Sequence, residues 1–179
     1  MMESLFRKCL WQNFGAAIDM LKEEIDLCPD DLWQKEGKFY YLSYHTIIFL
    51  DYYLTSPVRD FKPVLTYTIV DADKLPSDAV DDVIPDDFYS KKDCIDYLGK
   101  IREKCKNLIL LGPHEKFGQP WIDKTEVNMH GLCPNTVINY SLLEILFYNF
   151  RHIQHHVGQL NLMLRQKANN AADWISLVD

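Results

Sequence analysis

The sequence has no long hydrophobic run and no cluster of basic residues. Its apolar stretches are short and are broken by Asp51, Arg151 and the histidines, which argues against a membrane-spanning segment. Residues 1–8 are too polar for a signal peptide and contain no cleavage region. The formal net charge is −7, and phosphate binding depends on clustered Lys and Arg, so nucleic acid is not expected as a partner.

The cysteines form no C-x-x-C motif, and their number is odd. They are Cys9, Cys28, Cys94, Cys105 and Cys133. This pattern favours free, mostly buried thiols in a reducing compartment, and hence a cytoplasmic protein. We interpret the cysteines as small core residues rather than catalytic ones.

The 179 residues predict a single domain, 1–179, that is large enough to bury a core. Helical periodicity predicts four helices, at about residues 4–27, 38–56, 91–111 and 141–167. Two long connections separate them, at 57–90 and 112–140. We therefore expect an all-α fold, a four-helix bundle with crossover connections in which the second and third helices run parallel.

Several local features refine this prediction. The first helix should bury a stripe made of Leu5, Cys9, Phe14, Ile18, Leu21 and Ile25, and the second helix is apolar almost all round. Residues 64–70 favour a short extended piece. The aspartates between 71 and 87 lack the spacing of a calcium loop and indicate a solvated acidic surface. Ser141 and Glu144 have the spacing of a capping box, and the last residues, through Trp174 and Leu177, should pack back onto the bundle.

The most informative pattern is His152 and His156, four residues apart on the fourth predicted helix. This spacing places both imidazoles on one helix face, as in helical H-x-x-x-H zinc sites. His45, in the middle of the apolar second helix, is the candidate third ligand. Three neutral histidines would leave a divalent metal ion with an open position, which is typical of catalytic sites. The alternative is that all three are hydrogen-bonded core residues, because H-x-x-x-H alone is a weak pattern.

Other polar side chains could line such a site. Tyr41 and Tyr52 share the helix face of His45, and Tyr148, Asn149 and Gln159 flank the histidine pair at helical steps; ordinary core packing is an equal alternative for each. His155 lies about 60° around the helix from His152 and could flank the site or face solvent. Asp51 and Arg151 could pair within the bundle. Because no carboxylate is near the histidines in sequence, a peptidase-like hydrolase is less favoured.

Residues 44–46 (Y-H-T), 49–54 (F-L-D-Y-Y-L) and above all 148–160 (Y-N-F-R-H-I-Q-H-H-V-G-Q-L) resemble the DinB/YfiT-like metal-binding four-helix bundles of bacteria. The resemblance covers most of the chain, because the helix number, the long connections and the order of the histidines agree. It implies an up-down-down-up bundle, often dimeric. It also implies a divalent metal, commonly zinc or nickel, held by His45, His152 and His156.

The resemblance defines the function less closely than the fold. It implies a small-molecule substrate and, most directly, a metal-dependent transferase that moves a low-molecular-weight thiol to an electrophile. Two alternatives remain open. One is a metal-dependent hydrolase, and the other is a metal-binding or stress-response module without catalysis.

Overall fold

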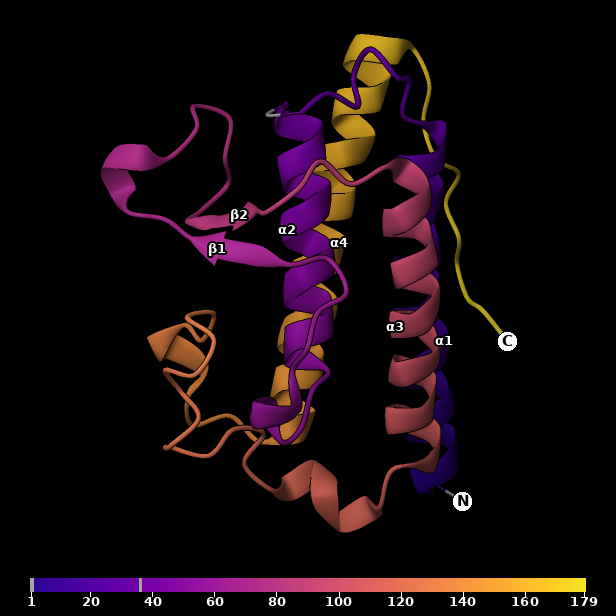
Figure 1. Ribbon diagram of the computed structural model, residues 1–179. Coiled ribbons are helices and arrows are strands. Elements are labelled where there is room, and N and C mark those ends of the chain that lie inside the picture. Colours follow the sequence, from indigo (N-terminus) through magenta and orange to yellow (C-terminus); the bar gives the residue numbers. More distant parts are fainter. Residues whose placement is uncertain (1, 36) are drawn as a thin grey trace.

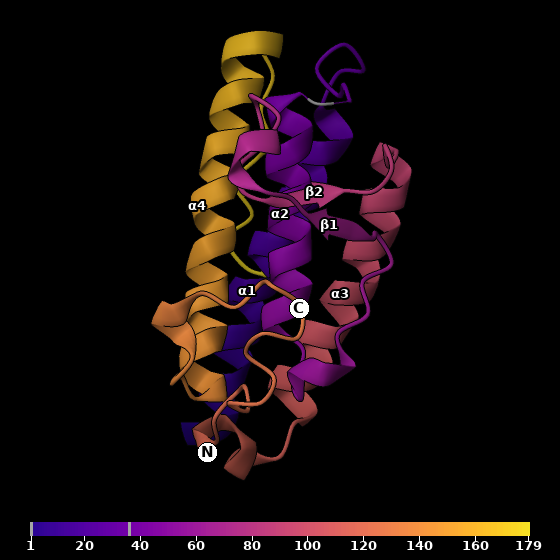
Figure 2. The ribbon, with the colours of Figure 1, turned by 60° about the vertical axis from the view of Figure 1, so that its left-hand side comes forward.

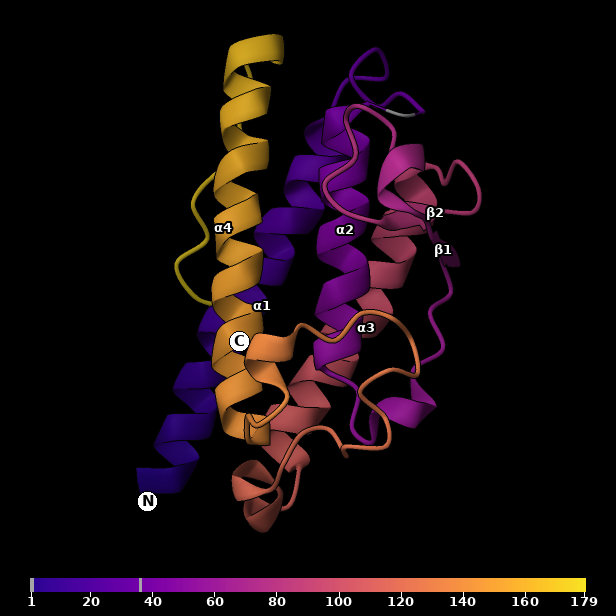
Figure 3. The ribbon, with the colours of Figure 1, turned by 90° about the vertical axis from the view of Figure 1, so that its left-hand side faces the viewer.

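Four helices make up most of the computed structural model, which describes residues 2–35 and 37–179. They are α1 (Met2–Leu27), α2 (Lys38–Tyr53), α3 (Lys91–Leu111) and α4 (Leu142–Ala168). Helix α1 packs against α3 and α4, and α2 packs chiefly against α4, as Figures 1 and 3 show. The predicted number and order of helices are confirmed.

The helix ends follow from local hydrogen bonding. The Ser141 hydroxyl accepts the Glu144 N–H, and the Glu144 carboxylate accepts the Ser141 N–H, so the predicted capping box opens α4. Helix α2 ends at Tyr53, three residues earlier than predicted. There the N–H groups of Leu54 and Thr55 bond to carbonyls three residues back, which tightens the chain before Pro57.

Helix α2 is the centre of the molecule, because every residue from Phe39 to Tyr53 is buried. Its outer side is crossed by a two-stranded antiparallel hairpin, β1 (Tyr67–Ile69) and β2 (Val83–Pro85), in which Thr68 pairs with Ile84. Figure 2 shows this hairpin lying across α2. The predicted extended piece is confirmed, whereas its partner strand was not predicted. Short 3₁₀ helices occupy Val58–Asp60, Ala72–Lys74, His114–Gly118 and Asn135–Val137.

The predicted buried stripe of α1 is only partly correct. In α1, Phe14, Ile18, Leu21 and Ile25 are buried as expected, but Leu5 and Cys9, in the first turns of the helix, are exposed.

The C-terminal segment does return along α1. The Val178 N–H bonds to the Gln12 carbonyl, and the Trp11 indole N–H bonds to the Asp179 carbonyl. However, the side chains of Trp174 and Leu177 are exposed rather than packed, because backbone bonds and Val178 make the contact with α1.

The predicted pairing of Asp51 with Arg151 is wrong. Arg151 is exposed, and the Asp51 carboxylate faces α3, where it accepts hydrogen bonds from the Tyr97 hydroxyl (2.5 Å) and the Lys104 ammonium (2.7 Å). This contact joins α2 to α3 in the core. None of the described helices combines the length and the hydropathy needed to cross a bilayer.

Candidate metal centre

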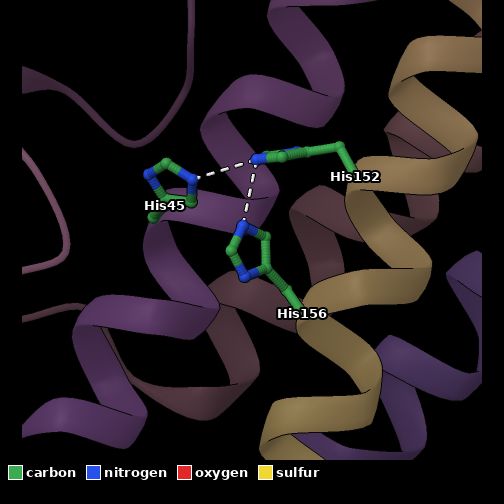
Figure 4. A group of neighbouring side chains, drawn as sticks. All are labelled: His45, His152 and His156. Atoms are coloured by element: carbon green, nitrogen blue, oxygen red, sulfur yellow. Dashed lines mark hydrogen bonds between the residues drawn. The ribbon is translucent and has the colours of Figure 1, made fainter.

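Three histidine side chains from the packed pair α2 and α4 meet at one point. His45 comes from the middle of α2, and His152 and His156 come from successive turns of α4, on the face that packs against α2. Figure 4 shows the three rings turned toward one another. The structure therefore brings together the three residues that the sequence singled out.

The nitrogen atoms that face one another are the three Nε2 atoms. His152 Nε2 lies 3.1 Å from His45 Nε2 and 3.0 Å from His156 Nε2. One ligand atom from each ring lies within 4.8 Å of the others. Two nitrogens bound tetrahedrally to one ion at about 2.0–2.1 Å are about 3.3–3.4 Å apart, so the two distances from His152 Nε2 are within a few tenths of an ångström of those in a metal site.

The outer nitrogens of two rings are hydrogen-bonded. His45 Nδ1 lies 2.8 Å from Asp81 Oδ2, and His156 Nδ1 lies 2.7 Å from Gln159 Oε1. Both oxygens are acceptors, so each Nδ1 carries the proton and donates it. In the neutral form of each ring, the Nε2 atoms of His45 and His156 then present lone pairs to the centre of the cluster.

Hydrogen bonding among the rings cannot use all these lone pairs. A neutral His152 has at most one proton on Nε2, and a single N–H can point at only one of its two neighbours. At least one of the lone pairs on His45 Nε2 and His156 Nε2 is then left without a proton donor, although each lies about 3 Å from His152 Nε2. The cluster holds more electron-pair donors than protons, which is the chemistry of a cation site.

An added proton would relieve this excess, but the surroundings oppose it. Burial, together with the charges of the neighbouring histidines, lowers the pKa of His152 to about 3. Burial also lowers the pKa of His156 to about 4, although the hydrogen bond to Gln159 acts in the opposite direction. Both rings are therefore neutral at pH 7 and available as ligands.

Aromatic rings form the wall around the cluster. The Phe49 ring lies 4.6 Å from the His45 ring, and the Tyr148 ring stacks on His152 at 6.3 Å with an interplanar angle of 5°. His152 Nδ1 is buried against this wall and has no hydrogen-bond partner within the described part of the chain. The wall lowers the local polarity and so favours the neutral form of the rings.

The other predicted side chains differ in their relation to the cluster. Tyr148 and Gln159 contact it, as described above. Asn149 is buried, and its amide donates to the Leu50 carbonyl at 3.0 Å, which ties α4 to α2 beside the site. His155 is exposed, with its ring 5.1 Å from that of His156.

Tyr41 and Tyr52 lie in the core of the molecule. Tyr41 is buried beside the Tyr40 ring. Tyr52, two turns along α2 from His45, packs edge-on against Phe61 and Trp121.

Sequence reasoning missed Asp81. We expected the aspartates from 71 to 87 to form a solvated acidic surface, and Asp81 instead accepts the hydrogen bond of His45. It is one of seven aspartates in the run and is 36 residues from His45, so no local spacing distinguishes it. Only the hairpin that crosses α2 brings it to the ring.

Comparisons of the chain with protein-family models, with curated proteins and with solved structures find no match. The resemblance to the DinB/YfiT-like bundles therefore rests on the sequence motifs alone and remains a prediction.

Proposed function

We propose that the protein is a metal-dependent enzyme that binds one divalent ion, zinc or nickel, through the Nε2 atoms of His45, His152 and His156. The observation that carries this proposal is the convergence of three imidazoles whose Nε2 atoms face one another, with too few protons between them to pair every Nε2 lone pair with a donor. Histidine nitrogen suits both metals.

The residues around the site favour a catalytic centre over a closed structural one. Three protein ligands leave a fourth position, and His152 and Asp81 are half-buried rather than fully enclosed. A bound divalent ion supplies Lewis acidity and lowers the pKa of a water or thiol that reaches it. The aromatic wall of Phe49 and Tyr148 would exclude bulk water from one side.

For the reaction we propose transfer of a low-molecular-weight thiol to an electrophile. The DinB-like motifs support this class of reaction. The placement of Asp81 is in keeping with it, because its carboxylate is held on the outer nitrogen of His45 and is not free to act as the general base of a hydrolase.

We further propose the up-down-down-up helix order and a homodimer, as the same resemblance implies. The long connection between α2 and α3, which crosses the bundle with its hairpin, supports a parallel α2–α3 pair.

The first test is metal content by mass spectrometry on untagged protein, repeated after titration with zinc or nickel. We expect about one ion per chain and its loss in His152→Ala. His155→Ala is the matched control, because it removes an exposed imidazole from the same helix. Equal metal content in the two variants, or no uptake by the wild type, would contradict the proposal.

The reaction is tested with the loaded protein, a panel of thiols and a chromogenic electrophile. We expect turnover that needs both metal and thiol. Turnover without thiol, rising with pH through about 7, would instead indicate hydrolysis. Metal binding without either activity would indicate a non-catalytic module.

A further inference from the structure

The three histidines of the cluster differ in what holds their outer nitrogens. His156 donates to the neutral amide of Gln159, which is exposed on the same helix. His152 Nδ1 has no partner in the described chain. His45 alone has a charged partner, the Asp81 carboxylate, which comes from a different part of the fold.

Asp81 is held firmly in place. Its Oδ1 accepts the Val83 N–H at 3.1 Å, while its Oδ2 accepts from His45. Val83 is buried and pairs with Ile69 in the hairpin, and the Val70 N–H closes the base of the intervening loop on the Asp82 carbonyl. Both carboxylate oxygens are therefore used, and the hairpin sets their position.

We propose that Asp81 is the positioning residue of the metal centre. It fixes His45 with the proton on Nδ1 and the lone pair of Nε2 directed at the ion, and its negative charge makes that nitrogen a stronger donor. In this role the hairpin across α2 is part of the site, and metal affinity depends on a segment that contributes no ligand of its own. The inference rests on the proposed metal binding.

Loss of the Asp81 carboxylate should lower metal affinity more than loss of the hydrogen bond to the outer nitrogen of another histidine. Asp81→Ala removes both the charge and the acceptor, so His45 is free to adopt either tautomer. Asp81→Asn removes the charge but keeps an oxygen that can accept from Nδ1. Outer partners of metal-bound histidines typically change metal affinity by about 10–100-fold. We expect a loss in this range for Asp81→Ala and a smaller loss for Asp81→Asn.

The experiment measures zinc dissociation constants by competition with a chromophoric chelator. Asp82→Asn is the matched control, because it removes the same charge from the exposed neighbouring residue, whose backbone oxygen closes the loop. We expect its affinity to stay within about twofold of wild type, as for exposed substitutions away from a site. An Asp81→Ala affinity equal to that of Asp82→Asn would overturn the proposal. Complete loss of binding, as in His45→Ala, would also overturn it, since Asp81 would then be a ligand.

A second readout needs no metal. In ¹⁵N-labelled metal-free protein, the His45 ring nitrogens report which of them carries the proton. We expect the Nδ1–H tautomer in wild type and in Asp82→Asn, and a shift toward Nε2–H in Asp81→Ala. An unchanged tautomer in Asp81→Ala would contradict the positioning role even where zinc affinity falls. If thermal unfolding shows that Asp81→Ala is not folded, Asp81→Asn takes its place in the zinc-affinity and the tautomer measurements.

The two proposals can fail separately. Wild-type protein that takes up no metal contradicts the proposed function, while the tautomer measurement still tests the contact between Asp81 and His45. Wild-type protein that binds zinc, with Asp81 variants indistinguishable from Asp82→Asn, contradicts only the role of Asp81.

Discussion

Single buried polar groups determine much of the chemistry of this protein. His152 and His156 are neutral at pH 7 because burial lowers the pKa of both rings. The same effect acts on an acid in α1. Glu24 is fully buried, and neither of its carboxylate oxygens has a hydrogen-bond partner in the described chain. Burial raises the pKa of Glu24 to about 8, although the nearby Asn161 amide lowers it.

We predict that Glu24→Gln becomes stabilising, relative to wild type, as the pH rises. Between the unfolded pKa of 4.5 and the folded pKa of about 8, the folded protein keeps a proton that the unfolded chain has lost. The wild-type free energy of unfolding therefore falls across this range, by an amount on the order of a few kcal/mol. Glutamine does not ionise, so the free energy of unfolding of Glu24→Gln does not fall in this way. Urea unfolding of both proteins at pH 5 and pH 8 measures the difference.

Glu23→Gln is the control for this comparison, since Glu23 is the adjacent and more exposed carboxylate. Its stability relative to wild type should change little between the two pH values. A constant difference between Glu24→Gln and wild type at both pH values would show that Glu24 is ionised in the folded protein.

At the scale of the helix, α4 supplies two of the three histidines of the cluster, and its own stability matters to the site. Gly158 lies two residues after His156. It lines a cavity with Met20, Asn161 and Trp174, on another side of α4 from the histidines. A Cβ atom at Gly158 would have no neighbour within 4 Å.

We predict that Gly158→Ala stabilises the protein by about 0.5–1 kcal/mol, because alanine loses less backbone entropy in a helix. Zinc affinity should not change. Chemical denaturation and chelator competition measure the two quantities.

Gly15→Ala, in α1, is the contrasting variant. It offers the same gain in helix propensity, but its Cβ would lie 2.5 Å from Val178 Cγ2 and 3.0 Å from the Trp11 ring. We expect it to be less stabilising than Gly158→Ala, or destabilising, because the C-terminal segment must move. If Gly15→Ala matches or exceeds the gain of Gly158→Ala, the packing of Val178 on α1 contributes little.

At the scale of the whole molecule, the bundle is held together by contacts between distant parts of the chain. Asp51 of α2 accepts from Tyr97 and Lys104 of α3, across the long connection that carries the hairpin. Lys104 also bonds to the Thr55 hydroxyl and the Asp51 carbonyl. The ammonium is partly exposed, whereas the carboxylate is buried.

We predict that Lys104→Ala lowers the free energy of unfolding by about 1–3 kcal/mol, because a buried carboxylate loses its cation. Thermal or urea unfolding measures the loss. Lys100→Ala, at an exposed position of the same helix, should change stability by less than about 0.5 kcal/mol. Equal effects of the two substitutions would mean that water replaces Lys104 as the partner of Asp51.

The sequence by itself determined the features that depend on near neighbours in the chain. Apolar periodicity defined the four helices, and the spacing of Ser141 and Glu144 located the start of α4. Residues 39–54 are apolar almost all round the helix, which indicated that α2 is buried. The pair His152 and His156 follows from helix geometry alone. His45 could be named as their partner because a histidine in an all-buried helix needs a polar neighbour.

Only the tertiary structure decided which distant groups meet. Asp81 reaches His45 across 36 residues, through a hairpin whose second strand has no distinctive pattern, and His45 meets His152 across 107 residues. Likewise, Asp51 faces α3 rather than Arg151 because packing sets the rotation of α2. Local spacing carries no information about such contacts, since they depend on how whole elements are placed. The three-histidine cluster was therefore predictable from the sequence, whereas the tautomer of His45 and the carboxylate that holds it were not.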